Sequence, residues 1–254
     1  PILSCCIILA AAIICIGRGK GVKAILGLGY SMFIIIYLVI PAVFSGYSPI
    51  WMSILCAVLS TAVTLLLLNG QSKKTYAAII ATTIGVLFAL LLFMLMSWML
   101  HLNGFSSSEA ESLILIHEST GLKIKDLLFA GVLISSLGAI MDVAVTISAA
   151  LSELLEKKPD LTFRGLFRSG REIGYDIMGT MISVLLFTFG SSLIPSFLIR
   201  MNNEVSFLTM VRLHIPLEIV EFLMESIGIV AAIPISILIS SCLLRRRGRR
   251  SEAI

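Results

Sequence analysis

The apolar residues of this chain gather into long uncharged runs instead of alternating with polar residues. A run of about 18 or more such residues predicts a helix that spans a bilayer, because backbone groups inside hydrocarbon must be hydrogen-bonded within their own segment. The short alternating segments of a membrane β-barrel do not occur in the sequence. The predicted fold class is all-α integral membrane, with seven helices over about 2–16, 24–44, 50–68, 77–100, 127–151, 177–199 and 217–244.

The first run, residues 2–16, is short for a spanning helix. At about 1.5 Å per residue it falls below the ~30 Å hydrocarbon core, so it must thin the bilayer or lie against a partner. It has neither a basic stretch before it nor a small-residue cleavage site after it, so it is predicted to be a helix and not a signal peptide.

Composition supports one membrane domain over residues 1–254. Of the residues, 58% are hydrophobic and 13% are charged, whereas a soluble domain has about a quarter charged residues. The net charge of +4 does not indicate nucleic-acid binding, because the basic residues stand in short connections and at the C-terminal end. The cysteines lie inside apolar runs without a pairing pattern and are predicted to be small buried side chains: Cys5, Cys6, Cys15, Cys56 and Cys242.

The basic residues predict how the helices are oriented. Alternate connections carry the clusters Arg18/Lys20/Lys23, Lys73/Lys74, Lys157/Lys158/Arg164/Arg168/Arg171 and Arg245/Arg246/Arg247/Arg249/Arg250. The other connections carry only Lys123, Lys125, Arg200 and Arg212. The positive-inside rule then places the C-terminus in the cytoplasm and, with seven crossings, the N-terminus outside. We expect a multi-pass protein of the bacterial inner membrane.

Asp142 is the most informative ionisable residue, because it lies inside the fifth predicted helix. A charged group there costs at least about 2.5 kcal/mol and usually faces a bundle interior or a water-filled cavity. Small and polar residues at helical offsets form one stripe with it: Ser135, Gly138, Ala139, Thr146 and Ala149. We expect this stripe to face inward. Asp142 is either a structural hydrogen-bonding group or part of a transport path.

Acidic residues also mark the seventh predicted helix. Glu218, Glu221 and Glu225 share one face by their spacing of three and four, and Glu225 lies deepest in the membrane. Because the fifth and seventh helices cross in opposite directions, the carboxylates of Glu225 and Asp142 are staggered in depth. A few waters between them would make a proton or cation relay, so Asp142, Glu221 and Glu225 form the predicted intramembrane acidic path.

The connection before the sixth helix has two predicted features. Arg171 is a candidate ion-pair partner for Asp176, which enters the sixth helix beside Gly179 and Ser183. Over residues 159–176 a basic stripe of Arg164, Arg168 and Arg171 opposes Phe163, Leu166 and Phe167, which is typical of a helix lying in the cytoplasmic interface. A docking helix for a partner and a basic loop that only fixes topology both stay open.

Other chemistry finds little support in the sequence. His101, His117 and His214 fall on the predicted outer side without metal-ligand spacing, and no metal site or cofactor is predicted. Ser108 and Glu111 have the form of a capping box, so a short outer helix is expected there, ending at Gly121. No P-loop, GxSxG, HExxH or CxxC pattern occurs, and the chain is predicted not to be an enzyme.

Three segments carry a resemblance to a known family. They are LGAIMDVAVTISAALSE at 137–153, FRGLFRSGREIGYDIMGTM at 163–181 and EIVEFLMESIGIVAAIP at 218–234. The chain resembles the YibE/F-like family of bacterial multispanning proteins, and its length is similar to that of the shorter of two paired members. The resemblance implies a membrane location and a paralogous membrane partner. Tyr175 departs from the Arg usual in the family, and ISVLLFTF at 182–189 replaces a more polar stretch.

Two functions fit these observations. The first is a subunit of a membrane transport or export assembly with an acidic intramembrane path. The second is a non-transporting scaffold that stabilises the paralogous partner. A membrane-embedded enzyme lacks any nucleophile-and-base pair in the sequence.

The predicted orientation has a direct test. Single cysteines replace Ser107 and Ser169 in a cysteine-free background, and an impermeant thiol reagent is applied to intact cells. We expect labelling at position 107 only, because the basic connection that holds Ser169 stays in the cytoplasm. Labelling at position 169 would reverse the orientation.

Overall fold

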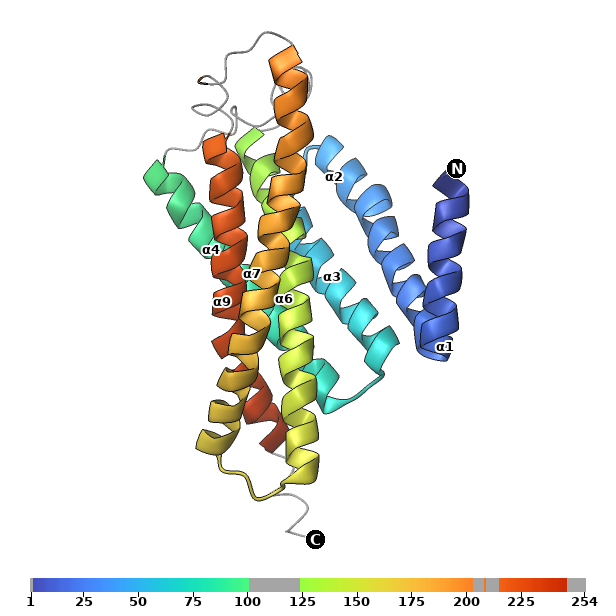
Figure 1. Ribbon diagram of the computed structural model, residues 1–254, viewed down its shortest axis with the longest axis vertical. Coiled ribbons are helices and arrows are strands. Elements are labelled where there is room, and N and C mark those ends of the chain that lie inside the picture. Colours follow the sequence, from blue (N-terminus) through green and yellow to red (C-terminus); the bar gives the residue numbers. More distant parts are fainter. Residues whose placement is uncertain (1, 101–123, 203–207, 209–214, 246–254) are drawn as a thin grey trace.

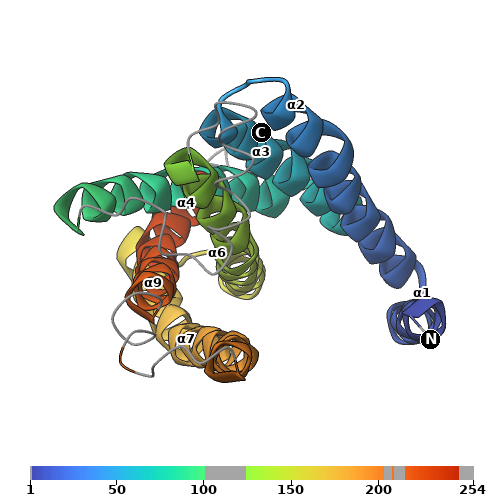
Figure 2. The same cartoon turned by 90° about the horizontal axis from the view of Figure 1, so that it is seen from above.

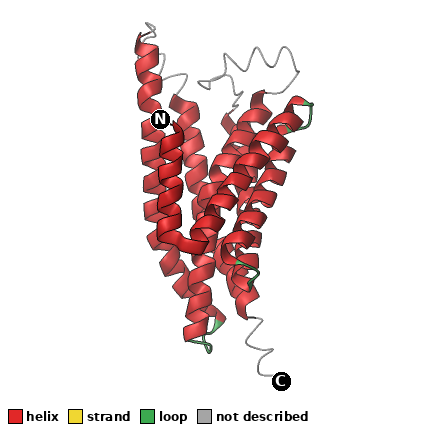
Figure 3. Cartoon of the chain, turned by 90° about the vertical axis from the view of Figure 1, so that its right-hand side faces the viewer, coloured by secondary structure: helices red, strands yellow, loops and turns green. Residues whose placement is uncertain are grey.

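A computed structural model describes residues 2–100, 124–202, 208 and 215–245, and every regular element in these ranges is helical (Figure 3). The elements are α1 (Ile2–Ile34), the π-helix η1 (Ile35–Val39), α2 (Ile40–Phe44), α3 (Pro49–Asn69), α4 (Lys73–Leu100), α6 (Ile124–Lys157), α7 (Phe163–Asn202) and α9 (Ile215–Arg245). The expected outer helix near Ser108 and the three histidines lie outside the described residues.

Six helices of the described part are long and apolar enough to cross a membrane. They span Ile7–Phe44, Pro49–Asn69, Lys73–Met99, Phe129–Lys157, Phe163–Pro195 and Glu218–Leu244. The first of these takes in both of the first two predicted helices. The all-helical, multi-pass prediction is therefore confirmed, with six candidate spans where the sequence predicted seven helices.

The first span contains a break at Arg18. Its backbone has φ 46° and ψ −128°, which interrupts the helix within the basic turn. In Figure 1 the chain reverses direction near this point. A side chain at Gly21 would meet the backbone of Ile13, although residues eight apart in a straight helix are about 12 Å apart. Glycine is required at Gly21 because the two halves of α1 approach closely there.

Proline explains the irregular passage from α1 to α2. Pro41 has no N–H to donate, so the regular helical bond to the preceding turn cannot form. The preceding residues adopt the wider π-helix, in which the N–H of Ile40 donates to the carbonyl of Ile35. The bend is therefore encoded locally.

The core lies where α4, α6 and α9 pack together. Large aliphatic side chains of α6 and α9 fill it, and Ile140, Ile147 and Ile229 are completely buried. Helix α7 packs closely on α9, because Gly170 and Gly174 of α7 lie against Ile237 and Ile233 of α9. The remaining helices extend this core on the other side, with α3 on α4 and α6, and α1 on α3.

The predicted interfacial segment belongs to a membrane helix in the structure. Thr162 caps α7 by accepting the Gly165 N–H at 3.2 Å, and the helix then continues from Phe163 to Asn202 without interruption. Leu166 is fully buried against the core. Residues 163–176 are thus the first turns of α7, not a separate helix in the membrane plane.

The reversal in α1 predicts a specific sensitivity. Gly21→Ala places a methyl group against the backbone of Ile13, and overpacking of this kind costs about 1–3 kcal/mol. Gly29→Ala is the matched control, since Gly29 has no atom within 4 Å of its added Cβ. In mixed micelles, we expect only the Gly21 variant to unfold at a lower concentration of denaturing detergent. Equal unfolding midpoints for the two variants would argue against the reversal of chain direction within α1.

Candidate functional site

The stripe that contains Asp142 lies on the face of α6 that points away from the helix core. Six residues along this face are exposed, namely Gly131, Ser135, Gly138, Asp142, Thr146 and Ala149. Ala139, which the sequence also placed in the stripe, is half-buried against the core. Added Cβ atoms at Gly131 and Gly138 would meet nothing within 4 Å. We call these six residues the α6 stripe. Because they face away from the core, the expectation that Asp142 points into the bundle is wrong for this chain alone.

Side-chain size explains the orientation of α6. The opposite face carries Ile140, Val143, Ile147 and Leu151, all with 0% exposure, packed in the cluster between α4 and α9. Branched aliphatic side chains fill space at native packing density, whereas glycine, serine and alanine would leave voids. The helix therefore turns its large residues inward, and the α6 stripe is left on the surface.

The carboxylate of Asp142 has no hydrogen bond or ion pair with any residue that the structure describes. Only the backbone of Asp142 is engaged, since its carbonyl accepts the hydroxyl of Thr146 at 2.8 Å. This position lies inside a candidate span, where ionisable residues usually pair with one another or face a water-filled cavity.

Glu225 of α9 reaches the same stripe. The hydroxyl of Ser135 donates to Oε1 of Glu225 at 2.5 Å, a bond between residues ninety positions apart in the sequence. Glu225 is half-buried beside a small cavity of about 10 Å³ lined also by Phe93, Phe129 and Met224. Ser135 and Asp142 are two helical turns apart on one face, roughly 10 Å. The structure thus brings Glu225 to the N-terminal part of the stripe, at Ser135.

Glu218 and Glu221 lie on α9 one turn apart and, like Glu225, are half-buried. Successive offsets of three and four keep the three carboxyl groups on one side of the helix, as the sequence predicted. Glu225 is the member whose contact with the α6 stripe is resolved.

The predicted ion pair of Arg171 with Asp176 does not form in the described part of the chain. The Arg171 guanidinium lies 5.9 Å from the centroid of the Tyr175 ring, while Arg168 pairs with Glu172 at 3.5 Å. Both observed contacts have the i, i+4 spacing that places side chains together on a helix, which the i, i+5 spacing of the predicted pair does not. Arg164, Arg168 and Arg171 are all exposed at the start of α7, so they remain a candidate basic surface.

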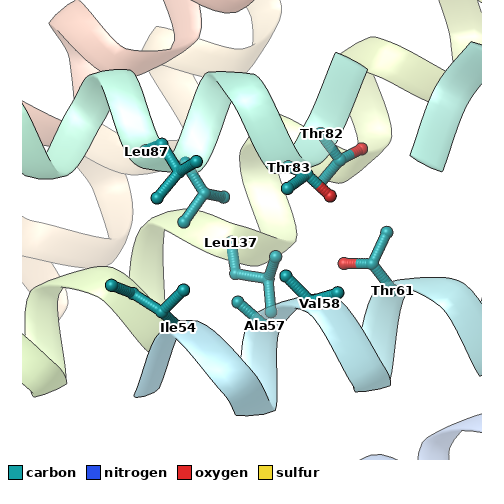
Figure 4. Close-up of a pocket in the computed structure, with 9 residues that line it drawn as sticks. Ile54, Ala57, Val58, Thr61, Thr82, Thr83, Leu87 and Leu137 are labelled. Atoms are coloured by element: carbon teal, nitrogen blue, oxygen red, sulfur yellow. The ribbon is translucent and has the colours of Figure 1, made fainter. Parts of the chain in front are cut away.

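Hydroxyl groups inside the helix contacts were not anticipated from the sequence. Thr61 of α3 and Thr82 of α4 are buried beside a cavity of about 10 Å³ (Figure 4), and neither hydroxyl has a hydrogen-bond partner among the described residues. Elsewhere Ser31 bonds Ser60 at 2.6 Å, and Ser148 bonds Ser240 at 2.8 Å. The sequence signal that could have predicted these contacts is the recurrence of serine and threonine at spacings of three and four residues. This pattern indicates polar contacts between helices in membranes.

The fold and this site define a multi-pass α-helical membrane protein with carboxylates inside its candidate spans. A family model described as YibE/F-like protein matches residues 5–246, and the chain belongs to that family. No curated protein and no solved structure matches the chain.

The bond between α6 and α9 gives a stability prediction. Ser135→Ala removes the donor to the half-buried Glu225 carboxylate, and the net contribution of such a hydrogen bond to stability is about 0.5–1.5 kcal/mol. Ser183→Ala is the control, because the exposed Ser183 hydroxyl bonds only the carbonyl of Gly179 in its own helix. Unfolding in mixed micelles is expected to shift for the first variant only. Identical curves would mean that the bond contributes nothing to stability.

Proposed function

We propose that this chain is a subunit of a transport or export assembly in the bacterial cell membrane. Asp142, Glu221 and Glu225 line its acidic path, and the chain crosses the membrane seven times with its N-terminus outside. The carboxylates provide sites that hold and release a proton or cation within the membrane, which is the usual role of ionisable residues at this depth.

The bond from Ser135 to Glu225 is the observation that carries this proposal. It joins the acidic face of α9 to the α6 stripe, on which Asp142 lies two turns further along. The stripe is made of glycine, serine, threonine and alanine, whose small side chains leave room for water between the carboxylates. The path then runs along a surface of this chain, and its other wall comes from a neighbour in the assembly.

A scaffold that holds a partner membrane protein is the second candidate. The exposure of the α6 stripe favours it, because small residues allow the close approach of another helix without any transport. Under this alternative the paralogous partner covers the stripe, and Asp142 serves only as a hydrogen-bonding group. The two functions differ in whether Asp142 must ionise.

Substitution at Asp142 separates the two. Asp142→Asn keeps size and hydrogen bonding but cannot ionise, so a relay predicts a normally inserted protein that fails to restore the phenotype of a deletion strain. Glu225→Gln is expected to be milder, and Glu218→Gln nearly silent, because Glu218 lies closest to the outer boundary. The readout is complementation by the chain expressed with its partner gene, with membrane levels measured by immunoblot.

The scaffold function predicts another result. Asp142→Asn then complements like the unmodified chain, while Asp142→Leu, which removes the hydrogen-bonding group, lowers the amount of protein or of its partner. That pair of outcomes would contradict the acidic path.

A further inference from the structure

We propose that the α6 stripe binds a transmembrane helix of a different chain, and that this helix carries a basic residue at the depth of Asp142. This inference rests on the exposed face of α6 and does not depend on transport. It specifies the chemistry of the partner, which neither the family match nor the proposed function supplies.

The hydrogen-bond donors of the stripe are already engaged. The Ser135 hydroxyl donates to Glu225, and the Thr146 hydroxyl donates to the carbonyl of Asp142. The remaining side chains are glycine, alanine and Asp142 itself, and an ionised carboxylate only accepts hydrogen bonds. The face thus presents acceptors and a negative charge, so the complementary surface must present donors.

Lipid does not satisfy this requirement. Acyl chains can cover the large apolar residues exposed on other helices, but they offer no donor to a carboxylate. In Figure 2 the N-terminal part of α1 stands far from α6. Helix α7 contacts α6, but the residues of the α6 stripe remain exposed in the described part of the chain. A helix from another molecule fits the requirement.

A second copy of this chain is a poor complement. It would bring the same acceptor face against itself, with two Asp142 carboxylates close together, and like charges at close range disfavour each other. Among the described residues of α6 between Phe129 and Leu151 the sequence has no lysine, arginine or histidine to pair with them. Charge complementarity therefore selects a different chain with a basic residue.

The small side chains set the geometry of the contact. Gly131 and Gly138 have no neighbouring atom within 4 Å of an added Cβ, and Ala149 is exposed on the same side. Small residues four apart let two helix backbones approach closely in lipid. A partner helix can then come near enough for a lysine or arginine to reach the Asp142 carboxylate.

Designed transmembrane peptides test this pairing directly. Three fluorescent Leu/Ala peptides with two glycines four apart differ only at the central residue, which is Lys, Met or Asp. Energy transfer to the labelled full chain is measured in phosphatidylcholine vesicles as the peptide-to-lipid ratio increases. We expect the Lys peptide to associate roughly tenfold more tightly than the Met peptide. Asp142→Asn should remove that preference, and Asp142→Lys should transfer it to the Asp peptide.

Steric controls locate the binding face. Gly138→Leu should block the Lys peptide, whereas Gly29→Leu on exposed α1 should leave its binding unchanged, since both glycines have open space around them. Equal binding of the Lys and Met peptides, or a Lys preference that survives Asp142→Asn, would overturn the proposal. Association of differently labelled copies of the chain that Gly138→Leu abolishes would also overturn it, because the face would then be a homodimer contact. None of these measurements reports transport, so the proposed function stands or fails separately.

Discussion

The cost of an unpaired polar group in hydrocarbon is the constraint on which this structure depends. It makes every regular element in the described part a helix, since helices satisfy their own backbone groups. It also explains the small hydroxyl contacts between helices, such as Ser31 with Ser60 and Ser148 with Ser240. The carboxylate of Asp142 is one place where the described chain leaves the constraint unmet, and the buried hydroxyls of Thr61 and Thr82 are others. An exposed carboxylate inside a span is therefore informative about what surrounds the protein.

Helix α6 unites the fold with the candidate site because it has two different faces. One face packs Ile140, Val143 and Ile147 into the core against α4 and α9. The other is the α6 stripe, joined to α9 by the bond from Ser135 to Glu225. The same helix thus holds the bundle together and carries the exposed carboxylate of Asp142 on its other face. A transport path and a binding face for a partner are compatible on this surface, because the partner would close the path.

The hydrophobic runs predicted the candidate spans well. They missed the amphipathic ends by which some helices extend beyond those runs. The predicted helix 50–68 is Pro49–Asn69 in the structure, whereas α6 and α7 extend beyond their apolar segments. The extra turns carry exposed pairs such as Lys157 with Glu153, which a count of apolar residues does not detect. The prediction that Asp142 points into the bundle was also wrong for this chain alone. Sequence alone identifies a stripe on α6, but which face is buried depends on the volumes of the neighbouring helices.

Spin labels placed singly along α6 test most directly whether the α6 stripe faces away from the core. In the purified chain in lipid, oxygen accessibility is measured at positions 138 to 149. We expect high accessibility at 138, 142, 146 and 149, and low accessibility at 140, 143 and 147. The opposite phase, with 140, 143 and 147 facing lipid, would contradict it.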